Sequence, residues 1–244
     1  MHPNQHDELV ASLAGAARNL INAGSLNSLD DVLVQVVQCA VQTVPNTDAA
    51  GISLATEERI ESRAPFNDSV LKLDSLQVEL GQGPCLRALA DPPLGGVVVV
   101  DDLSGADADR WPRFATQAEI YGYRAICSTQ LSANGGPHAA LNLYSHTANA
   151  FDSHARTVAG LFGVQAALLL YGAEHAANLG AALGSRDMIG QAKGILMERF
   201  DVDGDQAFQM LVRSSQDTNV KLVDVARWLV TERGAARLSK ASKP

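Results

Sequence analysis

Residues 185–230 read SRDMIGQAKGILMERFDVDGDQAFQMLVRSSQDTNVKLVDVARWLV, and their apolar side chains recur at helical spacing. The pattern predicts three short amphipathic helices that pack into one small unit. Ser185 is the expected N-cap, residues 201–204 and 217–219 supply turns, and Gly234 is expected to end the last helix. The predicted buried stripes are Ile189, Ala192, Leu196 and Phe200; Ala207, Phe208, Leu211 and Val212; and Leu222, Val225, Ala226, Leu229 and Val230.

Two glycines interrupt the first of these helices. Gly190 and Gly194 each cost roughly 0.5–1 kcal/mol relative to alanine in a helix interior. Arg186, Lys193 and Met197 recur at helical spacing along the same side. Such a strip suits the close packing of another helix, and it equally suits the approach of a nucleic-acid backbone or base between cations. The spacing alone leaves both interpretations open.

The start of the third predicted helix has a similar ambiguity. Asn219 and Lys221 precede it, where free backbone amides and the positive end of the helix dipole suit a phosphate. Asn219 is equally well explained as a cap residue of that helix.

The blocks IGQAKGILMERF at 189–200, QAF at 206–208 and NVKLVDVA at 219–226 resemble the ANTAR domain. This resemblance covers about a fifth of the chain. It implies recognition of structured RNA, in this family a pair of small stem-loops that prevents formation of a terminator hairpin. The positions carried over as candidate RNA contacts are Arg186, Gln191, Lys193, Asn219, Lys221 and Arg227.

Charge is divided unevenly along the chain. Residues 181–244 contain ten Lys and Arg against eight Asp and Glu, while residues 1–180 contain nine against nineteen. The C-terminal part therefore has a net charge of +2 and the remainder −10, which together give the overall −8. Because the acidic part repels phosphate, nucleic acid is expected to meet only the C-terminal part. A basic tail at 237–244 is expected to add salt-sensitive affinity.

Composition places the chain among ordinary globular proteins of the cytoplasm. At 244 residues it has room for two domains. The N-terminal residues are polar, and no run approaches the ~18–20 apolar residues of a membrane span, so no membrane association is expected. The three cysteines, Cys39, Cys85 and Cys127, are far apart and odd in number, which favours reduced thiols over a disulfide framework.

The N-terminal part alternates helix and strand signals. A hairpin is expected across residues 134–136, where Asn-Gly-Gly is a strong turn signal. Late strands joined by a hairpin favour an α+β layer with an antiparallel sheet flanked by helices. Helices are predicted at 7–23, 28–43, 69–80 and 113–121, and strands at 49–55, 59–64, 97–101, 124–132 and 138–145.

This order, with LGQGPCLRAL at 80–89 and VVVVDDL at 97–103, resembles a GAF domain over roughly residues 8–170. The resemblance implies a sensor with a six-stranded antiparallel sheet, frequent dimerisation, and a pocket for a small molecule of unknown identity. No cofactor is assigned. The candidate pocket residues are Cys85, Asp102 and Ser128. The predicted domains are a GAF-like sensor at 1–170, overlapping a connecting helix at 151–183, then an ANTAR-like domain at 184–236 and the basic tail.

Catalysis has little support. Cys85 follows Gly83-Pro84 and is placed to begin a helix, where the dipole lowers a thiol pKa, but a buried cysteine is commonly only a small apolar residue. No catalytic residues and no metal ligands are assigned, because the six histidines show no paired ligand spacing and zinc-type cysteine pairs are lacking. The chain is therefore not expected to be an enzyme.

The connecting helix carries an imperfect heptad seam. Its first half is expected to cover the sheet, whereas the seam beyond Tyr171 favours a parallel homodimer that passes sensor state to the RNA-binding end. The small residues in this seam suggest a weakly held pair able to rotate. The seam comprises Ala155, Val158, Phe162, Gln165, Leu169, Gly172, Ala176, Leu179 and Leu183.

The sequence thus predicts a cytoplasmic regulator that responds to a ligand or signalling partner and acts through RNA in transcription antitermination. Two alternatives remain. A small trihelical unit with Lys221 and Arg227 on its last helix also resembles a DNA-binding helix-turn-helix. In the other alternative, a ligand-binding or redox enzyme is centred on Cys85 and the C-terminal helices serve only to dimerise.

Overall fold

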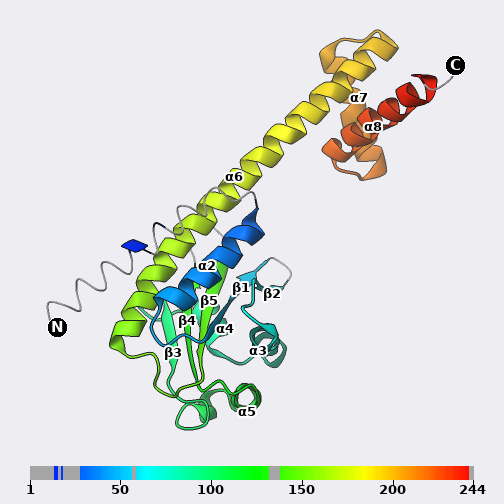
Figure 1. The fold of residues 1–244 in the computed structure, drawn as a ribbon. Helices are drawn as coiled ribbons and strands as arrows, with labels where there is room; N and C mark the ends of the chain where they lie inside the picture. The colour runs from blue at the N-terminus through cyan, green and yellow to red at the C-terminus, as the bar shows by residue number, and fades with distance from the viewer. Residues whose placement is uncertain (1–13, 16–17, 19–27, 57–58, 132–137, 242–244) are drawn as a thin grey trace. The chain divides into compact units, whose positions relative to one another are not determined.

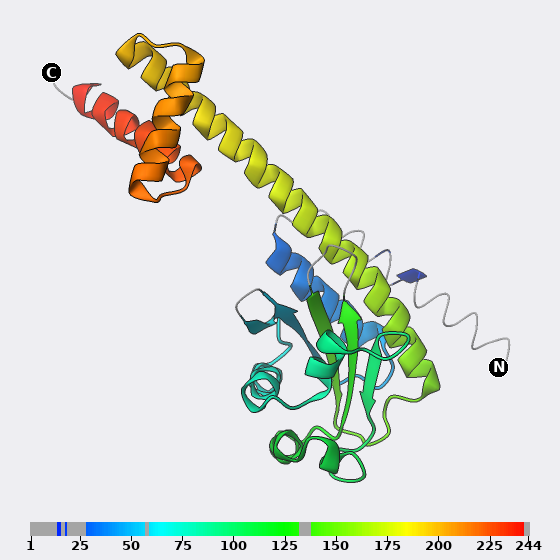
Figure 2. The same cartoon turned by 180° about the vertical axis from the view of Figure 1, so that it is seen from behind.

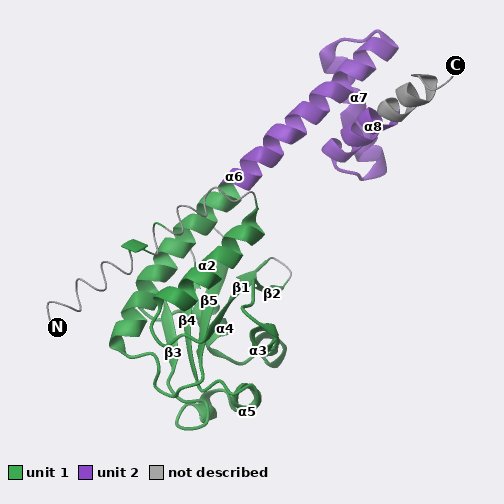
Figure 3. Cartoon of the chain, viewed as in Figure 1, with its two compact units in different colours: residues 1–175 green, residues 176–244 purple. Residues whose placement is uncertain are grey.

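The chain forms two compact units, residues 1–175 and 176–244 (Figure 3). The computed structural model describes residues 14–15, 18, 28–56, 59–131 and 138–241, with side chains up to residue 232. The predicted helix at 7–23 lies outside the described residues apart from 14–15 and 18. The predicted turn at 134–136 and the side chains of the tail also lie outside them.

An antiparallel sheet forms the centre of the first unit. Within the described residues it has five strands in the order β2-β1-β5-β4-β3, so the sixth strand expected from the family resemblance is not among them. β4 and β5 are buried along almost their whole length because helices cover both faces. The strands are β1 (Ala49–Ala55), β2 (Ile60–Arg63), β3 (Val97–Val100), β4 (Ala125–Leu131) and β5 (His138–Ser145).

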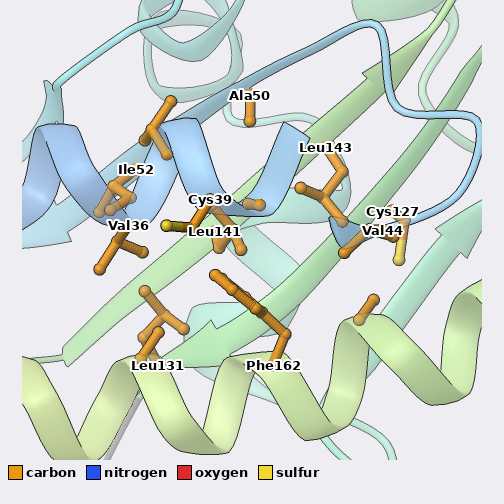
Figure 4. Packing of buried hydrophobic residues seen from close by; sticks show 14 of the residues in the cluster. Val36, Cys39, Val44, Ala50, Ile52, Cys127, Leu131, Leu141, Leu143 and Phe162 are labelled. Carbon is orange, nitrogen blue, oxygen red and sulfur yellow. The ribbon is translucent and has the colours of Figure 1, made fainter. Parts of the chain in front are cut away.

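Two helices, α2 (Leu29–Thr43) and the first part of α6 (Ser153–Phe200), cover one face of the sheet (Figures 1 and 2). Ser28 caps α2 by accepting a hydrogen bond from the backbone amide of Asp31. Between the helices and the sheet lies the main apolar core. Figure 4 shows Val36 and Cys39 of α2, Phe162 of α6, and Leu131 and Leu141 of the sheet meeting there.

The opposite face is covered by α3 (Asp68–Leu80), α4 (Pro84–Ala90) and α5 (Pro112–Ile120), with a short 3-10 turn at Ala108–Arg110. Gly81 ends α3 with a φ of 64°, a left-handed conformation that suits glycine. Pro84 begins α4, where the missing amide costs no helical hydrogen bond. These helices bury a second apolar cluster around Leu73, Phe114 and Tyr144.

Helix α6 runs without a break through the predicted start of the RNA-binding domain. Ser185 is therefore not an N-cap, and its hydroxyl donates a hydrogen bond to the carbonyl of Ala181 at 2.8 Å. By length and composition α6 meets the test for a membrane-crossing helix, because an 18-residue window has a mean hydropathy of 1.3. One such helix is weak evidence for a membrane span, since 39% of that window is buried inside the structure and a core helix has the same composition.

The predicted heptad seam on α6 divides into two parts. Ala155, Val158 and Phe162 are fully buried in the domain's own core, because this stretch covers the sheet. This half of the helix therefore covers the sheet, as expected from the sequence, and is not available to a second helix. Leu179 and Leu183 are exposed, as a dimer seam requires.

In the second unit, the end of α6 packs with α7 (Gly204–Thr218) and α8 (Leu222–Ala241). A capping box begins α7. The Asp203 carboxylate accepts a hydrogen bond from the backbone N–H of Gln206, and the Gln206 side-chain oxygen accepts one from the backbone N–H of Asp203. The prediction that Gly234 ends α8 is wrong, because the helix-forming residues that follow continue it to Ala241. The fully or nearly buried residues are Ala192, Leu196, Ala207, Leu211 and Ala226.

Three predicted members of the buried stripes, Phe200, Phe208 and Val212, lie outside the apolar cluster. Phe200 is the last residue of α6, before a turn at Asp201 with a φ of 54°, and it is 53% exposed. Phe208 is partly exposed and stands outside the apolar cluster. Helical spacing indicates the facing side of a helix but does not show where the neighbouring helix ends.

Candidate nucleic-acid interface

The second unit contains an open hollow of about 640 Å³ between the end of α6 and the beginning of α7. Three of the predicted RNA contacts, Arg186, Gln191 and Lys193, meet there. Gly190 leaves bare backbone at its surface, because a Cβ placed on this residue would meet no atom within 4 Å. The residues that line the hollow are Arg186, Asp187, Ile189, Gly190, Gln191, Lys193 and Phe208.

Positive charge in the hollow is available to a ligand. The Lys193 ammonium lies 5.9 Å from the centre of the Phe208 ring and near Gly204 at the start of α7. Within the described residues, no ion pair joins Lys193 or Arg186 to a carboxylate. Both cations can therefore bind phosphate without first breaking an ion pair of the described part of the chain.

The other three predicted contacts do not line the hollow: Asn219 and Lys221 lie in the turn from α7 to α8, and Arg227 is the sixth residue of α8. Asn219 does not cap α8 but ends α7, in a left-handed conformation with a φ of 52°. Lys221 is exposed, and its carbonyl accepts from the amides of Asp224 and Val225 in the first turn of α8. Arg227 forms an ion pair with Asp224, which reduces the charge it offers to RNA.

Two aromatic side chains of this unit were not predicted as contacts. Phe208 was assigned to the core because it follows Ala207 in the apolar stripe, and only the packing of α7 on α6 brings it to the hollow. Trp228 on α8 is 65% exposed. Trp228 follows the buried Ala226 by two residues, which places it on the opposite side of the helix. The helical spacing in the sequence is therefore enough to predict that this side chain faces solvent.

In the first unit, a buried polar cluster lies between the sheet and α3. Asp74 is 1% exposed. Its carboxylate accepts hydrogen bonds from the Tyr144 hydroxyl, from the Asn142 amide at 2.9 Å and from the Ser62 hydroxyl at 3.0 Å. Gln77 extends the cluster, donating to the Tyr144 hydroxyl at 3.2 Å.

Two of the three predicted pocket residues belong to this cluster. The Ser128 hydroxyl donates to the Asn142 side-chain oxygen at 2.8 Å, and the Cys85 amide donates to Gln77 at 2.9 Å. Asp102 does not join them, because it lies at the end of β3 and pairs with Arg124 at 2.7 Å. Asp102 thus stands outside the polar cluster that contains Cys85 and Ser128, and a ligand pocket formed by these residues stays a prediction.

Burial governs the ionisation of this cluster. It raises the pKa of Asp74 from 3.8 to about 6, against the opposing effect of three hydrogen bonds. Burial, with the nearby Asp74, raises the pKa of the Cys85 thiol to about 12. Burial also raises the pKa of Tyr144 well above its ordinary value. At neutral pH both Cys85 and Tyr144 are therefore uncharged, and the thiol is a poor nucleophile.

Within the described part of the chain, no group of three or more His, Cys, Asp or Glu side chains is placed to hold a metal ion. Residues 27–170 match the family model of the GAF domain, and residues 177–230 match that of the ANTAR domain. No curated protein matches the chain.

Solved structures share the fold at low sequence identity. The bacteriophytochrome RpBphP3 from R. palustris has a TM-score of 0.56 and 13% identity, covering 84% of this chain and 46% of that one. The Stigmatella aurantiaca phytochrome photosensory core module has a TM-score of 0.54 and 14% identity, with coverages of 85% and 44%. The LuxR family factor CepR2 from Burkholderia cenocepacia has a TM-score of 0.51 and 15% identity, with coverages of 68% and 98%. This chain spans less than half of either phytochrome structure, and the likeness shows the fold alone.

Proposed function

Because this chain belongs to the GAF domain family and carries an ANTAR domain at residues 177–230, we propose that it is a cytoplasmic, signal-responsive regulator that binds paired RNA hairpins and causes transcription antitermination. The match to the ANTAR domain is the observation that carries this proposal. The RNA is a nascent transcript, and the sensor domain sets when the protein binds it.

The hollow in the second unit supports an RNA partner. Arg186 and Lys193 supply charge without ion pairs to described carboxylates, and Gln191 adds an amide that can donate and accept. Asn219, Lys221 and Arg227 form a second group of candidate contacts around the turn from α7 to α8. Because Arg227 already pairs with Asp224, Lys221 is the stronger candidate of the two cations.

The sensor role is supported by the buried polar cluster around Asp74 and Asn142. It joins α3 to strands β1, β2, β4 and β5 through side-chain hydrogen bonds, with Ser53 bonded to Asn142 at 3.0 Å. A small molecule or protein partner that displaced one of these bonds would disturb several elements together. Cys85 and Ser128 are the candidate contacts for such a signal.

A homodimer through α6 is supported by the outer face of the helix. Leu161, Val164 and Leu168 follow one another at spacings of three and four residues and are 44%, 60% and 63% exposed. Between Arg156 and Arg186 the sequence contains a single Asp, Glu, Lys or Arg, which is Glu174. A long exposed helix face with so little charge is suited to burial against a second copy.

The proposal does not include catalysis. The redox alternative requires a reactive thiolate at Cys85, but burial keeps that thiol protonated at neutral pH. Both matched domains are of regulatory type. The exposed apolar part of α6 is assigned to self-association and not to a membrane, since the helix begins as a core element of the sensor domain.

The test is binding of the purified full chain to a paired-hairpin RNA and to duplex DNA across a salt series. Lys193→Ala and Lys221→Ala are expected to weaken RNA binding and to reduce the salt slope by about one each. Lys72→Ala is the matched control, because it removes the same charge from an exposed position of the sensor domain. Preference for duplex DNA, or equal losses in all three variants, would contradict the proposal.

A further inference from the structure

We infer that the hollow between α6 and α7 takes one unpaired nucleobase of the RNA, which stacks on the ring of Phe208. This inference rests on the proposed RNA binding and adds how the RNA is recognised. It assigns Phe208 and Asp187 to the interface, and of the two interpretations that the sequence leaves open for the strip at Gly190 it takes the approach of a base.

The polar groups of the hollow suit a base better than a phosphate. Asp187 presents a carboxylate beside the Gln191 amide, and a carboxylate repels a phosphate group. The edge of a base offers N–H donors to Asp187 and both donors and acceptors to Gln191. Arg186 and Lys193 then neutralise the phosphates on either side of the inserted nucleotide.

The space for a base is created by Gly190. A Cβ at this position would meet no atom within 4 Å, and the residue does not have a positive φ. Neither internal packing nor backbone conformation therefore requires a glycine here. An approaching flat ring would require one, since a base that lies against the helix backbone leaves no room for a side chain.

Phe208 supplies the stacking surface. It is partly exposed and lies outside the apolar cluster that holds the three helices together. The Lys193 ammonium covers the ring at 5.9 Å and, within the described residues, is held there by no ion pair. Its flexible stem lets it move to a phosphate when a base takes its place. Proteins commonly bind unpaired RNA bases by stacking them on aromatic side chains.

The experiment begins with RNA selected on the full-length protein from a pool of adjacent hairpins with fixed stems and randomised loops. Each loop nucleotide of the selected RNA is then replaced by an abasic one, and binding to wild type and to Phe208→Leu is measured. At one loop position the abasic substitution is expected to weaken wild-type binding at least tenfold but to weaken Phe208→Leu binding by a much smaller factor, because only the hydrogen bonds of the base to Asp187 and Gln191 remain to be lost there. This non-additivity identifies the base that stacks on the ring.

Gly190→Ala and Gly184→Ala form a matched pair on the same helix. A Cβ is free of contacts at both positions, and alanine favours the helix in both cases, but only Gly190 lines the hollow. Gly190→Ala is expected to lower RNA affinity about tenfold while Gly184→Ala has no effect. Circular dichroism and thermal melting verify that Phe208→Leu and both alanine variants are folded.

The failure of this inference differs from the failure of the proposed function. Suppose that wild type binds the selected RNA but that every abasic substitution lowers affinity by the same factor in Phe208→Leu as in wild type. Then no base stacks on this ring, and the inference falls while RNA binding stands. The same conclusion follows if Gly190→Ala binds as tightly as Gly184→Ala. If the pool yields no RNA that binds the protein, both fall.

Discussion

The hydroxyl of Tyr144 on β5 donates a hydrogen bond to the carboxylate of Asp74 on α3, which is buried inside the sensor domain and forms no ion pair with a described cation. A carboxylate in this position is costly to ionise, because its hydrogen bonds replace only part of its lost hydration. The pKa of Asp74 is accordingly raised to about 6. The two titratable groups nearest to it, Tyr144 and Cys85, stay neutral throughout this range.

Asp74 makes the stability of the sensor domain depend on pH. The unfolded carboxyl ionises near pH 4, whereas the folded one keeps its proton to about pH 6. The protonated carboxyl therefore makes its full contribution to the free energy of unfolding below pH 4. As the pH rises to 6 this contribution is lost, and the free energy of unfolding falls by about 3 kcal/mol. In Asp74→Asn this loss is expected to disappear.

Unfolding by urea at several pH values measures this effect. The chain has two tryptophans, and Trp228→Phe leaves Trp111 as a fluorescence probe of the sensor domain. Asp109→Asn, at an exposed position of the same unit, is the matched control and should keep the wild-type dependence. A parallel pH dependence in wild type and Asp74→Asn would show that the buried carboxyl does not titrate in this range.

The three cysteines are expected to be inert in the folded protein. All are buried, and burial raises the pKa of both Cys85 and Cys127 to about 12. A thiol reagent such as dithionitrobenzoate should react with less than about a tenth of the thiols at neutral pH and with all of them in concentrated guanidinium chloride. Fast reaction of one native thiol, absent in Cys85→Ser, would restore the redox alternative.

Asn219 allows a cap to be separated from an RNA contact. Its left-handed backbone suits asparagine and glycine, so Asn219→Ala is expected to cost about 1 kcal/mol while Asn219→Gly stays near wild type. Thermal unfolding in a Trp111→Phe background, followed through Trp228, reports this unit. RNA affinity is expected to fall in the folded glycine variant. If Asn219→Gly binds RNA as tightly as wild type, Asn219 only caps α7 and does not contact RNA.

The outer face of α6 gives a prediction about assembly. Val164→Glu combined with Leu168→Glu places charge on two exposed side chains and should leave the sensor core intact. Sedimentation equilibrium is expected to show a dimer for wild type and a monomer for the double variant. Thr116→Glu, at an exposed position of α5 on the opposite face of the sheet, is the control. A wild-type monomer at micromolar concentration would rule out this interface.

The sequence pattern predicted most of the fold for identifiable reasons. Turn residues located the β4–β5 pair, and helical spacing located α2 and the two buried residues of α7, Ala207 and Leu211. It failed at Ser185 and Gly234, where cap and stop residues lie inside continuous helices. Propensity acts locally, so one serine or glycine does not end a helix whose neighbouring residues favour it.

The candidate sites were only partly predictable. Arg186 and Lys193 lie seven residues apart on one face of α6, so their meeting in the hollow follows from helical spacing. Phe208 reaches them through the packing of a second helix. Asp74 lies 68 residues from its partner Asn142, and its helix gave no sign that one acidic side chain would be buried. Contacts between distant segments depend on tertiary packing, which a periodic pattern does not encode.

The uncharged outer face of α6 has a consequence for how RNA binding depends on protein concentration. If two copies associate through it, each transcript with paired hairpins meets two tethered binding units, and the second contact forms at an effective concentration set by the tether. Avidity of this kind exceeds the single-site affinity by about 10²–10⁴-fold and vanishes when the pair dissociates. Antitermination would then rise steeply over a narrow range of protein abundance, with Leu161, Val164 and Leu168 setting the threshold.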